Sequence, residues 1–419
     1  MRESGYPGAL RALCQDAAAG LDQVLAAAGE HVPARDPVLY LADYARQVLL
    51  PLAADVAAED VAGTMAGRAF TTGQPVTSQG DGEVRVWVPV LAQTNRTGVL
   101  AVTVPDAGPD ILEQARLLGI FAGLVVAAAD RVSDVPHVRR RVRDMSLPAV
   151  MQWDLLPPLS ARTTGAVIAG ILEPAYDIAG DVFDYALGDG DLHFAIIDAM
   201  GHGIGSTLLA GLAVGAYRHA RRRGEFLPDI HLAIDQALAG HHDDLSFATG
   251  IIGTLTSSTG RLEWSCAGHP PPLLLRDRKV VAELAGEPAL PFGLGGGTPQ
   301  LGAHDLEPGD AILLYTDGVT EARTPEGELF GLDRLTDLLE REAASEQPPE
   351  ELVRRLAQAV LEYQAEQLPI RSTCLGDPVG VQQYRVAGLQ VICSRQRGAA
   401  QAERKRRLAG QLGDHLAVA

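Results

Sequence analysis

Two different hydrophobic periods occur in the first 135 residues. The run 84–90 alternates apolar and polar residues, 99–104 is a second run rich in β-branched residues, and the polar stretch 95–98 between them predicts a hairpin. Other segments repeat their apolar residues every three or four positions, which predicts helices. These helices are expected at 10–28, at 38–50 (ending at Pro51) and at 112–129. The first region is therefore expected to be a mixed α+β unit.

A polar segment over residues 130–159 separates this unit from the rest of the chain. We interpret its basic run, 137–143, as a solvated helix face rather than an anion site. Further on, Met151, Leu155 and Leu156 form one helical stripe that ends at two prolines. Such a helix either joins two domains passively or carries a signal by packing against a second copy of the chain.

Beyond residue 165, short apolar runs alternate with two longer helical stretches. Strands are expected at 167–172, 193–197, 250–255, 261–266, 272–275 and 311–315. Helices are expected at 206–223, at 230–239, after Gly331 and after Pro349. Strands joined by turns, with the helices grouped between them, predict antiparallel sheets covered by helices, an α+β layered fold. No glycine-rich loop has the spacing of a nucleotide-binding motif.

Composition narrows the classes of function. A chain of 419 residues predicts two or three domains. Its net charge of −18 disfavours binding to nucleic acid, whose phosphates it would repel. The longest uncharged apolar run, 117–129, is shorter than the roughly 20 residues of a membrane span, and no apolar signal core is present, so we expect a cytoplasmic protein without membrane contact. Four scattered cysteines argue against a disulfide framework and a zinc site.

Four short acidic or glycine-rich motifs follow one another in the third region. They are Ala179-Gly180-Asp181, Asp198-Ala199-Met200-Gly201-His202-Gly203, Ala267-Gly268-His269-Pro270 and Thr316-Asp317-Gly318-Val319-Thr320-Glu321-Ala322. Asp198 and Asp317 each follow an apolar strand directly, so their carboxylates emerge at strand ends beside glycine turns. Hard divalent cations prefer oxygen ligands, and the Ala199 carbonyl offers one more. Carboxylates buried there are costly unless they are paired or metal-bound.

Simpler interpretations apply to each motif alone. An Asp-Gly pair such as Asp317-Gly318 is usually an ordinary turn. His269 belongs either to a shaped turn between strands or to an acid–base pair, and the turn is the simpler interpretation. His241 and His242 lie beside two aspartates, but in a polar loop a solvated cluster explains them better.

Taken in order, the motifs resemble the SpoIIE-type branch of the metal-dependent (PPM) Ser/Thr protein phosphatases. The segments that continue the resemblance are 177–184, 247–255, 266–275, 291–294, 306–310 and 330–331. The resemblance implies a PPM-type antiparallel β-sandwich flanked by helices. It also implies two Mn²⁺ or Mg²⁺ ions that activate water for attack on phosphoserine or phosphothreonine. On this basis Asp181, Asp198 and Asp317 are the catalytic carboxylates, and they bind the metals together with the Ala199 carbonyl.

The first region resembles a GAF domain, a sensor of small molecules or partners, on the order of its elements and on residues 67–76. A plain scaffold for dimerisation, with no small ligand, is the alternative. The expected domains are a GAF-like sensor (1–135), a helical linker (136–160), a phosphatase domain (161–368) and a divergent basic tail (369–419). The linker favours a homodimer.

The C-terminal part departs from the family pattern. The family closes its site with a pair of acidic residues before a last strand, yet no such pair follows residue 364, and Asp377 stands in an unlike context before Pro378. We therefore expect the loss of one metal ligand and one sheet strand, which puts the second metal in doubt. Three functions remain: a phosphatase acting on a phosphorylated regulator, such as an anti-anti-sigma factor in partner switching; a non-catalytic binding module with the same fold; or a protein whose sensor domain is the main functional unit.

Overall fold

The computed structural model describes Cys14 and residues 34–80, 82–177, 180–188, 190–240, 246–287, 289–365 and 387–394. The chain divides into two compact units, Met1–Met145 and Ser146–Ala419. The helix expected at 10–28 lies outside the described residues apart from Cys14, and so do His241, His242 and Asp377.

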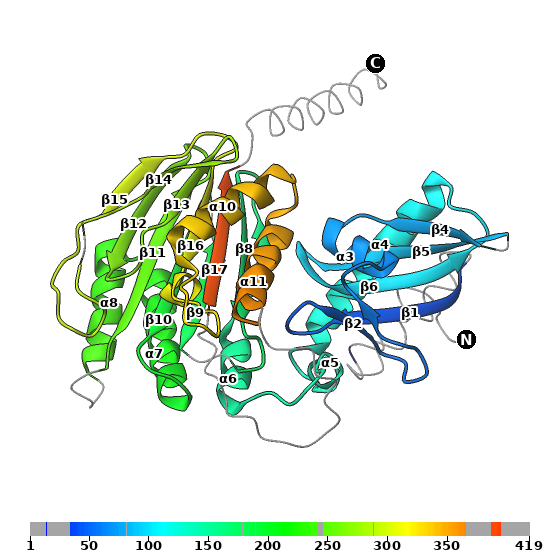
Figure 1. Ribbon diagram of the computed structural model, residues 1–419, viewed down its shortest axis with the longest axis horizontal. Coiled ribbons are helices and arrows are strands. Elements are labelled where there is room, and N and C mark those ends of the chain that lie inside the picture. Colours follow the sequence, from blue (N-terminus) through cyan, green and yellow to red (C-terminus); the bar gives the residue numbers. More distant parts are fainter. Residues whose placement is uncertain are drawn as a thin grey trace, which may run out of the picture. The chain divides into compact units, whose positions relative to one another are not determined.

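The first unit is built on one six-stranded antiparallel sheet with the order β3-β2-β1-β6-β5-β4 (Figure 1). Its strands are β1 Arg35–Ala42, β2 Val48–Pro51, β3 Glu59–Asp60, β4 Val76–Gly80, β5 Glu83–Ala92 and β6 Asn95–Val104. The long helix α4, Pro109–Ala129, packs on one face, where it shares a core with Leu39 and Leu41. The short helix α3, Met65–Thr72, packs on the other face through Phe70. The sheet is thus covered on both sides.

The helix expected at 38–50 is wrong, because this segment forms β1, a turn and β2. The Asp43 carboxylate makes the turn by accepting the backbone N–H groups of Gln47 and Val48 at 2.7 and 2.9 Å. Arg46 adopts the left-handed conformation there, with φ of 55°. Both faces of β1 are buried, so its apolar run lacks the alternation that marks a half-exposed strand. The turn expected at 95–98 also lies earlier, at residues 93–94, and Asn95 already begins β6.

Helix α4 is the one described helix that is long and apolar enough to cross a membrane. In this structure its buried side packs on β5 and β6. A helix in the core of a mixed unit has the same composition, so α4 by itself does not indicate a membrane span.

The short helix α5, Val135–Arg139, belongs to the first unit. His137 bonds Tyr44 through Nδ1 at 3.0 Å, and Arg140 lies over the Tyr44 ring while donating to the Ala42 carbonyl at 2.9 Å. Part of the basic run is therefore docked, and its interpretation as a fully solvated helix face is wrong for His137 and Arg140.

The second unit is a sandwich of two antiparallel sheets between two helical layers (Figure 1). The first sheet has the order β15-β12-β11-β10-β9. Its strands are β9 Asp181–Leu187, β10 Asp191–Ala199, β11 Ala248–Thr256, β12 Arg261–Ala267 and β15 Gly302–Asp305. Helices α7, Ile204–Arg222, and α8, Leu227–Ala239, cover its outer face and share a core with β10 and β11.

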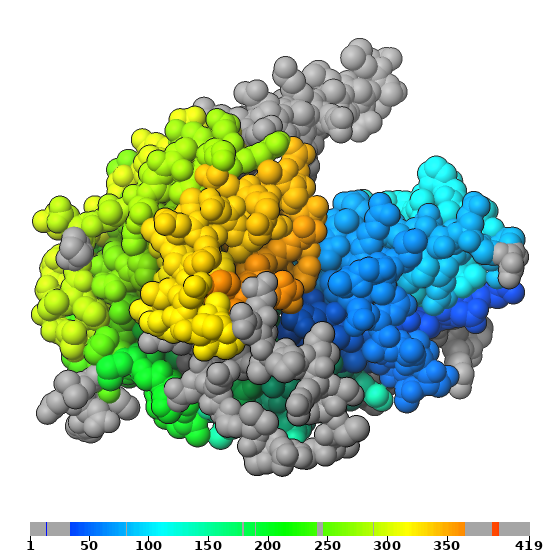
Figure 2. Space-filling model, viewed as in Figure 1, coloured from blue at the N-terminus to red at the C-terminus, as the bar shows by residue number. Residues whose placement is uncertain are grey.

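The second sheet has the order β14-β13-β16-β17-β8-β7. Its strands are β7 Ser160–Arg162, β8 Ala166–Glu173, β13 Leu273–Arg276, β14 Lys279–Glu283, β16 Ala311–Tyr315 and β17 Ala387–Ser394. The helices on this side are α9 Asp317–Thr320, α10 Gly331–Ala344 and α11 Pro349–Ala365. Figure 2 shows α10 and α11, coloured orange, at the surface of the second unit. A core between the two sheets, with residues such as Phe194, Ile251 and Leu314, holds the sandwich together.

The expected loss of a sheet strand is wrong. Strand β17 lies between β16 and β8 and pairs with both along most of its length, from Leu389 opposite Tyr315 to Cys393 opposite Ala311. Its apolar residues alternate between the inner core and the helix-covered face, because Ile392 packs between the sheets and Val391 against α11. The family's acid pair is absent, but the strand that should follow it is present.

The expected linker helix is also present, as α6, Leu147–Leu155. The Ser146 hydroxyl caps its first turn by accepting from the Ala149 N–H at 3.3 Å. The division between the two units, at Met145 and Ser146, lies inside the expected linker 136–160.

Candidate metal centre

Asp181 and Asp198 lie directly opposite each other on neighbouring strands. Asp181 is the first residue of β9, Asp198 is near the end of β10, and the antiparallel register makes them partners. Both follow the alternation of residues that face the other sheet, such as Ile196 on β10. Paired positions on one face of a sheet bring their side chains close together, and like charges there repel. The fold thus collects two of the expected carboxylates at one end of the sandwich interior.

The second sheet supplies the third carboxylate and a fixing hydroxyl. Strand β16 ends at Tyr315, Thr316 caps the short helix α9, and Asp317 is the first residue of that helix. The Thr316 hydroxyl donates to Asp181 Oδ2 at 2.6 Å and accepts the Gly388 N–H at 2.9 Å. The Thr316 N–H in turn donates to the Gly388 carbonyl at 3.0 Å. Thr316 therefore ties β9 to β16 and β17 at the point where the aspartates meet.

The electrostatics of Asp181 show that the three aspartates form one cluster. Asp181 is only 4% exposed. Burial and the negative charge of Asp198 raise the pKa of Asp181 well above its usual range; Asp317 raises it further, and the Thr316 hydrogen bond opposes the shift. A buried carboxylate beside two others favours a proton or a cation. The structure therefore brings Asp181, Asp198 and Asp317 together, as the sequence predicted.

Backbone geometry places the Ala199 carbonyl at the same point. Gly180 has a φ of 102°, and a Cβ built on it would lie 2.9 Å from the Ala199 carbonyl oxygen. The Ala199 N–H donates to the Gly180 carbonyl at 3.2 Å. Only glycine combines this backbone conformation with so close an approach. The glycine of the first motif thus lets the chain before Asp181 pass beside the predicted carbonyl ligand.

These groups fit a divalent cation with open coordination positions. Within the described residues, no group of three or more His, Cys, Asp or Glu side chains is close enough to hold a metal ion on its own. Mg²⁺ is usually bound through one or two carboxylates and keeps several waters, so a loose set of aspartates plus a carbonyl suits it better than it suits zinc. The raised pKa of Asp181, caused first by burial and then by the charge of Asp198, is the observation that favours a cation here.

Two further polar residues complete this end of the sandwich: Thr249, which was not a sequence candidate, and His269 of the third motif. Thr249 on β11 is the partner of Asp198 on the side away from Asp181. Its hydroxyl lies 3.0 Å from Nδ1 of His269, a buried residue just after β12. Thr249 carries no recognisable motif, so only the strand register reveals it. Burial lowers the pKa of His269 to about 3, so the ring is neutral at pH 7.

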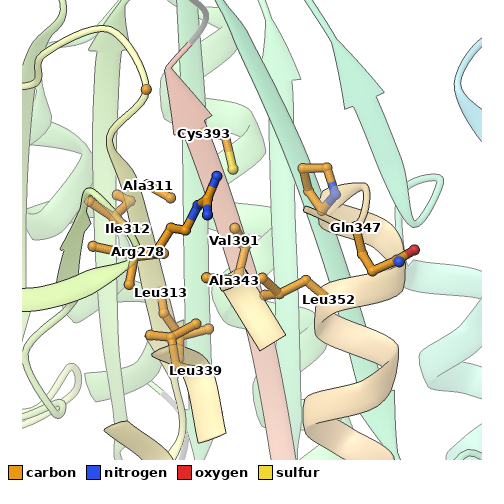
Figure 3. A pocket seen from close by; sticks show the side chains of 13 residues that line it. Arg278, Ala311, Ile312, Leu313, Leu339, Ala343, Gln347, Leu352, Val391 and Cys393 are labelled. Atoms are coloured by element: carbon orange, nitrogen blue, oxygen red, sulfur yellow. The ribbon is translucent and has the colours of Figure 1, made fainter. Parts of the chain in front are cut away.

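A separate cavity of about 170 Å³ lies on the other side of the second sheet (Figure 3). Its walls include Leu313, Leu352 and Val391, which belong to the core under α10 and α11 rather than to the core between the sheets. Cys393 also lines it, and burial raises the pKa of this thiol to about 12. The cavity is therefore mainly apolar and distinct from the aspartate cluster.

Comparison with known families agrees with this geometry. Residues 188–369 match the model of the family "Stage II sporulation protein E (SpoIIE)". The matched stretch contains Asp198 and Asp317, and Asp181 precedes it. The second unit is therefore similar to the SpoIIE-type branch of the PPM phosphatases, and this match supports the predicted enzyme class, a metal-dependent phosphatase.

Two curated relatives share this part of the chain. Protein IcfG of Synechocystis sp. is 26% identical over 231 residues, which are 48% of this chain and 34% of the relative. The phosphoserine phosphatase RsbU of Bacillus subtilis is 25% identical over 227 residues, 54% of this chain and 67% of the relative. The match thus spans about a third of the length of IcfG.

Among solved structures, the SiaA-PP2C domain of Pseudomonas aeruginosa is 21% identical, with a TM-score of 0.47, over 59% of this chain and 94% of that domain. The predicted fold class, a helix-flanked antiparallel sandwich of the α+β class, is confirmed by the architecture itself. The GAF-like nature of the first unit stays a prediction.

Proposed function

We propose that this chain is a Mn²⁺- or Mg²⁺-dependent phosphatase that removes phosphate from phosphoserine or phosphothreonine of a regulatory protein. The observation that supports it best is the cross-strand pair Asp181–Asp198, in which Asp181 is buried, accepts a hydrogen bond from Thr316 and feels the charge of Asp317. Carboxylates gathered in this way cost stability unless a cation compensates them.

The chain's own residues have distinct tasks in this proposal. Asp181, Asp198 and Asp317, together with the Ala199 carbonyl, would hold the metals. Bound there, the metals would lower the pKa of a water and neutralise charge on the phosphoryl group. Thr316 keeps Asp181 in one orientation, and Gly388 keeps Thr316 in place. Precise orientation matters because a misplaced carboxylate loses both metal affinity and rate.

The substrate and the control are inferred from the relatives. A phosphoserine phosphatase among the relatives supports a phosphoserine protein as substrate. We propose an anti-anti-sigma-type regulator in a partner-switching pathway, with the first unit as the sensor that controls hydrolysis. A cytoplasmic homodimer that contacts neither nucleic acid nor membrane completes the proposal.

A non-catalytic binding module is the second candidate, and one observation favours it. The sequence lacks the acid pair that the family pattern requires before its last strand, although the strand itself is present. A site with one ligand fewer could hold its fold and its partner without hydrolysing phosphate.

Hydrolysis of p-nitrophenyl phosphate by the full chain distinguishes the two. The phosphatase predicts hydrolysis that needs Mn²⁺, stops with EDTA and is abolished by Asp198→Ala. Asp191→Ala, at the other end of the same strand, is the matched control and should retain the rate. Hydrolysis that persists in Asp198→Ala would contradict the mechanism, and none in the unmodified chain with saturating Mn²⁺ would favour the binding module.

A further inference from the structure

His269 spans the gap between the two sheets at the aspartate end of the sandwich. Its Nδ1 lies 3.0 Å from the Thr249 hydroxyl on β11. The ring also interacts with the backbone of Tyr315 on β16, which directly precedes Thr316 and Asp317. His269 therefore connects a residue beside Asp198 with the strand that delivers Asp317.

The environment of the ring selects one protonation state. His269 is 6% exposed, and its Nε2 atom is buried with no hydrogen-bond partner among the described residues. A buried, neutral imidazole has one N–H and one acceptor nitrogen. The Tyr315 backbone interaction favours a proton on the ring, as a carbonyl acceptor does. With the proton on Nε2, Nδ1 accepts the Thr249 hydroxyl hydrogen.

We propose that His269 is a positioning residue of the metal centre, which as the neutral Nε2–H tautomer accepts the Thr249 hydroxyl hydrogen. This relay leaves the lone pairs of Thr249 Oγ1, and not its hydrogen, to face the space beside Asp198. The hydroxyl then accepts a hydrogen bond from a water of that site and does not compete with a cation for the Asp198 carboxylate. The inference rests on the proposed function of the same site.

This role differs from that of a turn residue. Gly268, with a φ of 63°, already provides the turn, and the Cys266 thiol donates to the His269 carbonyl at 3.2 Å whatever the side chain. The side chain adds a specific link between two strands. Groups that orient metal ligands from behind typically change metal affinity by about 10- to 100-fold when they are lost.

Two pairs of variants test the relay in the full chain. In His269→Asn, the Asn Oδ1 lies where Nδ1 was, so it can still accept from Thr249. In His269→Gln the amide reaches the Nε2 position and loses that contact. Thr249→Ser keeps the hydroxyl and Thr249→Val removes it. We expect His269→Gln and Thr249→Val to weaken Mn²⁺ binding, measured by titration calorimetry, by about 10- to 100-fold. His269→Asn and Thr249→Ser should stay within about threefold of the unmodified chain.

The double variant Thr249→Val/His269→Gln should bind Mn²⁺ no more weakly than either single variant, because both break the same link. Additive losses, or Mn²⁺ affinity unchanged in all four variants, would overturn the proposal. Thermal midpoints measured in EDTA separate loss of folding from loss of metal binding. The unmodified chain could bind Mn²⁺, and the variants could show the expected affinities, without any hydrolysis of phosphate. That result would refute the proposed function but would still support the role of His269.

The tautomer can be checked without metal. Nitrogen NMR of the ¹⁵N-histidine-labelled chain in EDTA, with His269→Asn to assign the signal, should show a neutral ring protonated at Nε2 at pH 7. Thr249→Val should move the Nδ1 signal, and Thr249→Ser should not. A ring protonated at Nδ1 would refute the relay, because Thr249 would then have to accept from it.

Discussion

Asp181 and Asp198 face each other across β9 and β10 in a position where two carboxylates repel. The raised pKa of Asp181 means that the metal-free folded chain binds a proton there more tightly than the unfolded chain does. This contribution to stability is full below the ordinary pKa of an aspartate and is lost as the pH rises through the raised value. A bound cation would relieve the same repulsion.

The substitution Asp181→Asn should therefore stabilise the metal-free chain and impair the metal-loaded one. In EDTA at pH 8 we expect a gain of about 1 kcal/mol in the free energy of unfolding. The gain should shrink at pH 5, where Asp181 is more protonated. Hydrolysis with Mn²⁺ should fall by more than about tenfold. Urea unfolding at both pH values checks the sign, and Asp191→Asn is the control. A loss of stability at pH 8 would contradict the repulsion.

Thr316 should matter through its hydroxyl. Thr316→Val keeps the shape but removes the donor to Asp181 and the acceptor for the Gly388 N–H, leaving both groups buried. We expect a cost of about 1–3 kcal/mol in unfolding free energy. Thr316→Ser retains the hydroxyl and should cost much less. An equal loss of unfolding free energy in the two variants would show that the hydrogen bonds of the Thr316 hydroxyl do not determine the stability at this position.

Gly180 and Gly201 offer a matched test of close backbone approach. Both have a positive φ, 102° and 93°, but only a Cβ at Gly180 would meet an atom, the Ala199 oxygen; Gly201 has open space. Gly201→Ala should carry the backbone strain alone, about 1 kcal/mol. Gly180→Ala should cost more and should also weaken Mn²⁺ binding in calorimetry, because the Ala199 carbonyl must move. Similar stability and affinity in the two variants would rule out a special role for the contact.

Most strands and the aspartate cluster could be predicted because a short local sequence pattern indicates each of them. Apolar runs ending in Asp198 and in Asp317 mark strand ends, and the antiparallel fold brings those ends together. The contact between Thr249 and His269 could not be predicted from such a local pattern. Their importance depends on register and on packing between sheets, which no local pattern encodes. Thr249 matters only because it is the partner of Asp198.

Two of the wrong predictions, those for β1 and β17, have different physical causes. In β1, burial on both faces hides the strand alternation, and the Asp43 turn carries no glycine or proline to mark it. In β17, the unfamiliar residues before Ala387 obscured a strand whose own apolar alternation is clear. Burial on both faces removes the alternation of apolar and polar residues in β1. In β17 the apolar residues still show a clear alternation.

Glu351 should give helix α11 a pH-dependent anchor. It is 2% exposed and accepts hydrogen bonds from Arg354 at 2.7 and 2.8 Å and from Arg355 at 2.9 Å. Burial alone would raise the pKa of Glu351, but the two guanidinium groups outweigh it and lower the pKa. The stabilisation is therefore present above the ordinary pKa of a glutamate and disappears as the pH falls through the lowered value.

Accordingly, Glu351→Gln should cost about 2 kcal/mol in unfolding free energy at pH 7. The difference from the unmodified chain should narrow below pH 4.5. Glu362→Gln, on the exposed side of the same helix, is the control and should change little. Unfolding in urea at pH 7 and pH 4 measures both, and a difference that widens toward acid would contradict the lowered pKa.

Gln390 is a polar side chain in the core between the sheets. It lies on β17 between Leu314 of β16 and Gly170 of β8, it is fully buried, and neither of its amide atoms has a hydrogen-bond partner in the described structure. An unpaired buried amide costs about 1–3 kcal/mol. Leucine has a similar volume and no polar atoms to satisfy, so Gln390→Leu should raise the free energy of unfolding by about 1–3 kcal/mol. Gln390→Glu places a charge at the same position and should destabilise the chain strongly. Chemical denaturation at pH 7 compares the three forms. A loss of stability in Gln390→Leu would show that the amide makes bonds in solution that hold β17 in the sheet.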